Sequence, residues 1–246
     1  RVRQSAVEIV PALMGCTRRH ETRHEISKLC LRLMDDRVDA VRKTAAECLC
    51  LGGSSLARHG EDDGGEWIRK IVIPHLQTCS TSKDSKQRLL SLKMVEIIIT
   101  NGLCPTTAMA VPTTPRASVA ESEAASPGSC DTESTAATTT DGNATETPLR
   151  TILKIAASRA SDEVANVRLN VGRTLGAILP LLLIESEGPR SEGDDVDFVV
   201  TTLEKQLEEE TARPGGGDRD VLYFARQAVS MAPPSAVRRT SSTVST

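Results

Sequence analysis

The stretch S-D-E-V-A-N-V-R-L-N-V-G-R-T-L-G-A-I-L, from Ser161 to Leu179, decides how the fold is interpreted. It begins with polar residues that predict a turn. A helical pattern follows, with apolar residues at Val164, Val167, Val171, Leu175 and Ile178. Steps of three and four place these residues on one helix face. The other side is also small or apolar, at Leu169, Gly172, Gly176 and Leu179. This helix is therefore predicted to be covered by neighbours on two sides.

The same pattern recurs in five segments of the chain. Their first apolar position holds Val2, Val41, Gln87, Val167 and Val221. Four residues later the position is mostly small, with Ala6, Ala45, Ser91, Val171 and Ala225. Eight residues later it is apolar, with Val10, Leu49, Val95, Leu175 and Val229. A basic residue follows the first position at Arg3, Arg42, Arg88 and Arg168, and Leu222 replaces it in the last segment. Helix pairs that repeat about every 40 residues predict an all-α HEAT-repeat α-solenoid, a stack of antiparallel helix pairs.

The composition is typical of such a stack and excludes some classes of partner. Apolar residues make up 39% of the 246 residues but aromatic residues only 2%, which suits thin layers of aliphatic side chains between helices. A net charge of −3 predicts no nucleic-acid partner, and no apolar run has the length of a membrane span. The seven cysteines are scattered without a C-x-x-C pair, which favours reduced thiols and a cytoplasmic or nuclear location.

The repeats are predicted to lie in two blocks. Residues 1–102 form the first block, whose first repeat is truncated because Arg1 already falls inside a helical pattern. Residues 103–147 are rich in Thr, Ser, Ala and Pro and predict a disordered insert. Residues 148–229 form the second block, and residues 230–246 are a Ser/Thr-rich tail that is predicted to be disordered.

Several local features set expectations for individual helices. Residues 1–14 are expected to be the second helix of the truncated repeat. The next repeat is expected to have its first helix at 24–34 and its second at 38–51, which ends at Gly52-Gly53. A polar loop is expected at 54–65. Pro74 lies inside the next helix, where it removes a hydrogen bond or bends the chain.

One motif suggests metal chemistry. His20-Glu21-Thr22-Arg23-His24 matches H-E-x-x-H, which binds zinc when it lies on a helix. A catalytic zinc needs three protein ligands, and neither a third ligand segment nor an apolar face accompanies this motif. No phosphate-binding loop or Ser/His/Asp set is suggested either. The chain is therefore predicted to have no catalytic residues, metal or cofactor, with a metallohydrolase based on His20 and His24 as an alternative.

The arginines beside the first apolar position have two interpretations. Arg42 can pair with Asp39 or Asp36, and Arg168 with Asp162, which would form a structural ladder between repeats. The same arginines could instead dock an acidic partner. Trp67, the single tryptophan, either packs in a helix interface or anchors a partner at the surface.

Three strings resemble a known family. E-W-I-R-K-I-V-I-P at Glu66–Pro74, E-V-A-N-V-R-L-N-V at Glu163–Val171 and R-D-V-L-Y-F-A-R-Q-A at Arg219–Ala228 occur in this order. They resemble the C-terminal HEAT repeats of the phosphatase 2A scaffold subunit and of its relative, regulatory subunit 1 of phosphatase 4. The insert and the tail do not belong to the compact scaffold subunit, and they favour the phosphatase 4 relative.

The resemblance implies a non-catalytic subunit that binds the catalytic subunit of a serine/threonine phosphatase of the 2A or 4 type, with a further regulatory subunit or a substrate as additional partners. It places the binding ridge on the turns within repeats, with Trp67 as a lesser candidate. The matching residues are Asp36, Arg37, Asp39, Lys83, Asp84, Asp162, Glu163, Asn166, Asp218, Arg219 and Asp220. A generic HEAT adaptor, such as a transport receptor or a tubulin-binding array, is the alternative.

Overall fold

A computed structural model describes residues 2–17, 19–57, 63–104, 147–186 and 194–232. All regular elements within these ranges are helices, so the predicted all-α class is confirmed there. The predicted insert and tail lie almost wholly outside the described residues. The helices are α1 (Val2–Glu8), α2 (Val10–Cys16), α3 (His20–Leu33), α4 (Asp39–Ala57), α5 (Asp63–Trp67), the π-helical turn η1 (Ile68–Val72), α6 (Ile73–Ser80), α7 (Ser85–Thr100), α8 (Pro148–Ala157), α9 (Ala165–Ser186), α10 (Asp194–Thr211) and α11 (Arg219–Ser230).

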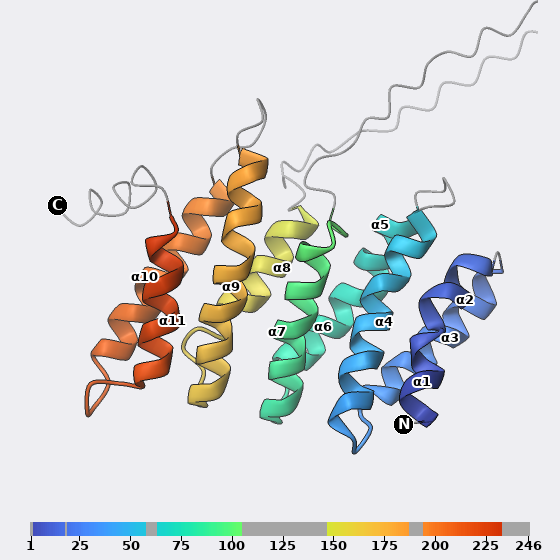
Figure 1. The fold of residues 1–246 in the computed structure, drawn as a ribbon, viewed down its shortest axis with the longest axis horizontal. Helices are drawn as coiled ribbons and strands as arrows, with labels where there is room; N and C mark the ends of the chain where they lie inside the picture. Colours follow the sequence, from blue (N-terminus) through green and yellow to red (C-terminus); the bar gives the residue numbers. More distant parts are fainter. Residues whose placement is uncertain (1, 18, 58–62, 105–146, 187–193, 233–246) are drawn as a thin grey trace, which may run out of the picture.

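The helices lie in two layers (Figure 1). The front layer contains α1 and α2, then α4, α7, α9 and α11, and the rear layer contains α3, α5 to α6, α8 and α10. Each rear helix packs against the front helix that follows it in sequence, as α6 does against α7 and α10 against α11. Neighbouring front helices also pack on one another. Pairs of helices that are consecutive in sequence are therefore neighbours in space.

The aligned apolar positions face the interior of the two layers. Val41, Val167 and Val221 are at most 3% exposed. The small positions four residues later are completely buried, at Ala45, Ser91, Val171 and Ala225. The first segment is the exception, because Val2 is 86% exposed and Ala6 is also exposed at the end of the front layer. Small residues also allow α9 and α11 to approach closely, since a Cβ on Gly176 would lie only 3.0 Å from that of Ala228.

Three helix boundaries differ from the expectations. The expected helix over 1–14 is interrupted at Ile9, because Pro11 has no N–H to donate and its ring crowds the carbonyl group four residues earlier. The helix expected at 24–34 already begins at His20. The helix expected to end at Gly52-Gly53 continues to Ala57, so the expected loop at 54–65 is shorter. Gly52 is buried against the Trp67 indole, where even a Cβ would make an ordinary contact at 3.5 Å, and it lies within the helix instead of ending it.

Pro74 lies at the start of α6, directly after η1. Because proline has no N–H, the α-helical bond to the carbonyl group of Lys70 cannot form. The five residues before α6 adopt the wider π-helical pattern, which commonly occurs as a single turn within an α-helix. The predicted local effect of this proline is thus confirmed.

Among the described helices, α9 alone is long and apolar enough over Ala165–Ile184 to cross a membrane by length and composition. It packs between α7 and α11 in the front layer, and 56% of its most apolar window is buried within the protein. Its position as a central helix with neighbours on both sides accounts for this composition.

Candidate partner-binding edge

The turns that join each rear helix to the next front helix lie along one edge of the two layers, the lower edge in Figure 1. They comprise residues 34–38, 81–84, 158–164 and 212–218. The residues that flank the internal segments outside the described ranges lie toward the opposite edge. The edge is thus built from short connections of the same kind.

In three of these turns an arginine of the front helix binds the turn from the inside. Its Nη1 donates to the carbonyl oxygens six and five residues earlier in the chain. The two distances are 2.8 and 3.2 Å for Arg42, 2.9 and 2.9 Å for Arg88, and 2.8 and 3.1 Å for Arg168. One side chain therefore satisfies two carbonyl groups of the turn. We call this repeated arrangement the arginine clamp.

A second repeated bond shapes the same turns. The side-chain oxygen six residues before each clamp arginine accepts the backbone N–H two residues further on. The distances are 2.8 Å for Asp36, 3.1 Å for Ser82 and 3.0 Å for Asp162. Asp and Ser favour turns through this bond. The alignment of the helices therefore extends to the conformation of the turns.

Buried ion pairs connect consecutive helix pairs beside the clamps. The Nε of Arg88 lies 2.8 Å from Oδ2 of Asp162, and the two side chains are 5% and 3% exposed. Arg168 donates from Nε and Nη2 to both carboxylate oxygens of Glu210, at 2.7 and 3.0 Å. Paired in this way, each buried charge has its counterion, which burial requires. The edge is held both within and between helix pairs.

The last turn lacks a clamp arginine, and Glu210 takes over part of its role. Its Oε1 accepts the backbone N–H of Asp218 at 2.7 Å. Burial raises the pKa of Glu210, but hydrogen bonds from Arg168 and from the N–H of Asp218 outweigh this effect and hold the pKa below its usual value. Gly217 has a φ of 72° and passes so close to the Glu210 carbonyl group that a Cβ would collide with it.

The predicted ladder is correct in part. Arg42 binds the Asp39 carboxylate at 2.8 Å, as expected. Arg168 binds only the backbone carbonyl of Asp162, so the expected pairing with its carboxylate is wrong. That carboxylate is occupied by Arg88 of the preceding helix pair, and Arg168 pairs with Glu210 of the next one.

The predicted ridge residues separate into three groups. Trp67 is 8% exposed and its indole N–H donates to the Leu49 carbonyl at 3.0 Å, so it packs in a helix interface and does not belong to the edge. Asp162 is buried in its ion pair, while Asp36 and Asp218 are half-buried and hold turn N–H groups. The remaining side chains are exposed on or beside the turns, at Arg37, Asp39, Lys83, Asp84, Glu163, Asn166, Arg219 and Asp220.

Metal and nucleophile chemistry finds little support in the described part of the chain. No group of three His, Cys, Asp or Glu side chains there is arranged to hold a metal ion, and the side chain of His20 lies outside it. The Sγ of Cys79 is 3.2 Å from Nε2 of His75. Burial raises the pKa of this thiol to about 11 and lowers the pKa of the histidine, so the reactive thiolate is disfavoured.

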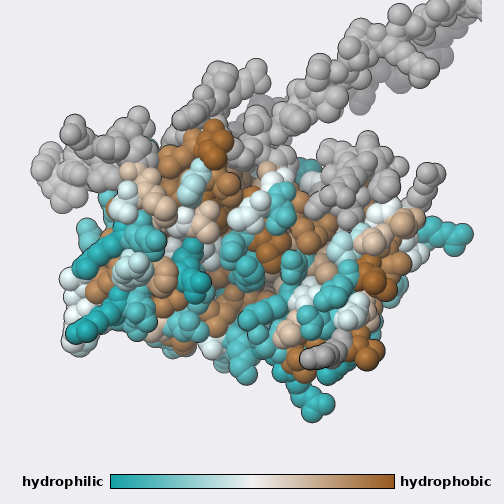
Figure 2. Space-filling model, in the orientation of Figure 1, coloured by the Kyte–Doolittle hydropathy of each residue, from teal (hydrophilic) through white to brown (hydrophobic). Residues whose placement is uncertain are grey.

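A groove of about 750 Å³, which was not predicted from the sequence, lies on the front face. It crosses α4, α7, α9 and α11, and Figure 2 shows this face hollowed near its centre. Asp39 and Asn166 of the predicted edge line one end of it. The aligned repeats contained a signal: the positions one before, three after and six after the first apolar residue share a helix face. They line the groove at Lys86, Leu90, Lys93, Asn166, Asn170, Arg173, Phe224 and Gln227.

Comparison with known proteins leaves the family open. No protein-family model and no curated protein matches the sequence. Among solved structures, the chain matches a crystal structure of an engineered protein with 10% sequence identity, and the alignment covers 92% of this chain and 88% of that one. The TM-score is 0.34, which is too low to carry an argument about fold or function.

Proposed function

We propose that the chain is a HEAT-repeat α-solenoid that acts as a non-catalytic scaffold or regulatory subunit of a type 2A-group serine/threonine phosphatase. The observation that supports this proposal best is the edge of clamped turns. Consecutive helix pairs direct the same turn to the same side (Figure 1), and exposed charged residues lie on or beside each turn. The resemblance of the three sequence strings supplies the identity of the partner, a catalytic subunit of the phosphatase 4 or 2A type.

A rigid edge suits a docking role for a physical reason. Each exposed side chain that a partner must immobilise costs about 0.5–1.5 kcal/mol, and flexible loops cost more. The arginine clamp fixes the turn backbones before a partner arrives, so less ordering remains to be done on binding. The proposed role is to position the catalytic subunit, in the cytoplasm or the nucleus, while the chemistry belongs to that subunit.

The test is a pull-down from cell extract with the purified chain as bait, followed by immunoblotting for the phosphatase 4 and 2A catalytic subunits. The edge variant carries Glu163→Lys and Asp220→Lys, because both side chains are exposed and cap no helix. The control carries Glu47→Lys and Glu66→Lys, which change the charge equally on α4 and α5, away from the turns.

We expect the unaltered chain and the control to retain one of the two catalytic subunits and the edge variant to lose it. Retention of the phosphatase 4 subunit would favour the regulatory-subunit relative, and retention of the 2A subunit would favour the scaffold. If the unaltered chain binds neither, the phosphatase proposal is wrong and the generic adaptor is the better description. If the edge variant retains as much catalytic subunit as the unaltered chain, the turns are not part of the interface.

A further inference from the structure

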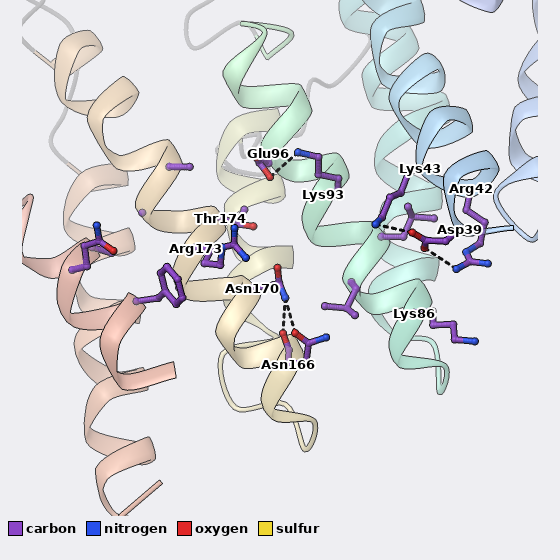
Figure 3. A pocket seen from close by; sticks show the side chains of 18 of the residues that line it. Asp39, Arg42, Lys43, Lys86, Lys93, Glu96, Asn166, Asn170, Arg173 and Thr174 are labelled. Carbon is purple, nitrogen blue, oxygen red and sulfur yellow. Dashed lines mark hydrogen bonds and ion pairs between the residues drawn. The ribbon is translucent and has the colours of Figure 1, made fainter. Parts of the chain in front are cut away.

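Basic residues outnumber acidic residues in the lining of the front-face groove. Its rim contains the basic side chains of Arg42, Lys43, Lys86, Lys93 and Arg173. The two carboxylates that line it are already engaged: Asp39 binds the first two cations, and Glu96 binds Lys93 at 3.1 Å. Figure 3 shows these pairs on α4 and α7.

Two cations of the rim are left over. Among the described side chains, neither Lys86 nor Arg173 has a carboxylate partner, and both are exposed. The Arg173 guanidinium lies over the Phe224 ring, 5.2 Å from its centroid, which restricts where the charge can point. In Figure 3, Lys86 projects from α7 on the side of α4, and Arg173 lies on α9. The two free charges therefore lie at separate places along one groove.

The lining between the cations is partly apolar. Leu89, Leu90, Phe224 and Met231 contribute to it, and Met231 is 42% exposed. Neighbouring helix axes lie about 8–10 Å apart, so four front helices span roughly 24–30 Å. An extended peptide of about nine residues covers that length. The whole chain has a net charge of −3, so attraction of an anionic ligand requires a local excess of positive charge, which the lining of this groove provides.

We propose that this groove binds an acidic peptide segment of a partner protein, with Lys86 and Arg173 pairing its carboxylates and the apolar lining receiving its aliphatic side chains. A nucleic acid fits less well, because its recognition uses extended basic surfaces and several stacking aromatics, and Phe224 is the one aromatic side chain in the lining. The proposal does not depend on the phosphatase assignment, since the groove crosses the helices and the proposed phosphatase edge consists of turns.

The probe is a fluorescein-labelled ten-residue peptide of glutamates with two leucines, and fluorescence anisotropy measures its binding to the full chain. The groove variant carries Lys86→Glu and Arg173→Glu. The control carries Lys70→Glu and Lys205→Glu, an equal charge change at two side chains that are each 71% exposed on rear-layer elements. A neutral variant, Lys86→Gln with Arg173→Gln, separates loss of attraction from added repulsion, and circular dichroism checks that each variant is folded.

We expect the groove variant to bind at least about tenfold more weakly and the control to stay within about twofold of the unaltered chain. The neutral variant should fall between them, and binding should weaken with added salt. The proposal is overturned if the unaltered chain does not bind the peptide, or if the groove variant and the control lose binding equally. It is also overturned if a peptide with glutamines in place of the glutamates binds equally tightly, or if single-stranded RNA binds more tightly. The edge variant of the phosphatase test should keep peptide binding, so the two proposals fail separately.

Discussion

The substitution Glu210→Ala tests whether the buried ion pair holds the last helix pair in place. Glu210 is 1% exposed at its side chain and receives two hydrogen bonds from Arg168, whose own side chain is 5% exposed. Removing the carboxylate leaves the guanidinium buried without its main counterion. Breaking a buried pair in this way costs about 3–5 kcal/mol.

This loss is large relative to the total stability of a typical domain, about 5–15 kcal/mol. For a chain of this size it corresponds to a fall in melting temperature of roughly 10 °C. Because α11 receives its described contacts mainly from α9 and α10, we expect the amide protons of α10 and α11 to lose protection from hydrogen exchange first. Urea unfolding followed by circular dichroism gives the free energy.

The matched control is Glu208→Ala, an exposed position on the same helix, which should change stability by less than about 0.5 kcal/mol. The double variant Arg168→Met with Glu210→Leu removes both charges and should recover a large part of the loss. If Glu210→Ala costs no more than the control, the pair does not stabilise the fold. If the double variant is as unstable as Glu210→Ala, the unpaired charge is not the cause.

The same residue predicts the response to acid. The pKa of Glu210 is lowered in the folded chain, so its ionised form contributes stability above its unfolded pKa of about 4.3. That contribution is lost as the pH falls from this value through the folded pKa. The difference in stability between the unaltered chain and Glu210→Gln should therefore shrink below about pH 4.3. A difference that stays constant down to lower pH would contradict this assignment.

Three further outcomes test the packing. Gly176→Val should destabilise the chain by about 1–3 kcal/mol in urea unfolding, because its side chain meets Ala228 across the α9–α11 contact, and a neutral effect would refute that contact. Trp67→Phe should cost about 1–2 kcal/mol by removing the hydrogen bond to Leu49, and native Trp67 fluorescence should shift to longer wavelength on unfolding. Cys30 is completely buried and burial raises its thiol pKa to about 12, so it should react with maleimide only in denaturant, which mass spectrometry can determine.

Helix positions and their buried faces could be predicted from the sequence because period and side-chain size are local properties. The alignment predicts a helix through Gln87, Ser91 and Val95, and α7 covers all three. The small aligned position is buried at Ala45 and Ala225. The ends were less predictable, because tertiary contacts overrode local signals. Gly52 looks like a helix stop, but α4 continues through it to Ala57, and Gly52 packs against Trp67, a residue outside its own helix.

The candidate site was predictable to a lesser degree for the same reason. The repeat predicts that the turns share one edge. The choice of acidic partner for each arginine, however, depends on the offset between helix pairs. Asp162 lies only six residues before Arg168 and yet pairs with Arg88. The groove is harder still to predict, because its lining combines side chains from four helices. Which of its cations are free to bind a ligand depends on which of them already pair with carboxylates of the same groove.

The clamps also imply that the stack is not equally stiff along its length. At the second clamp, Ser82 stands where Asp36 and Asp162 each receive an arginine from the preceding pair, at 2.5 and 2.8 Å. A serine offers Arg42 no charge, so hydrogen bonds cross this junction in place of that ion pair: Gln87 donates to Asp35 at 2.7 Å, and the Trp67 indole donates to the Leu49 carbonyl at 3.0 Å. Bending is therefore expected to concentrate between α4 and α7, and the front-face groove crosses this joint. A ligand that contacts both α4 and α7 would restrict bending at this junction. Binding in the groove would therefore set the curvature of the edge that meets the partner.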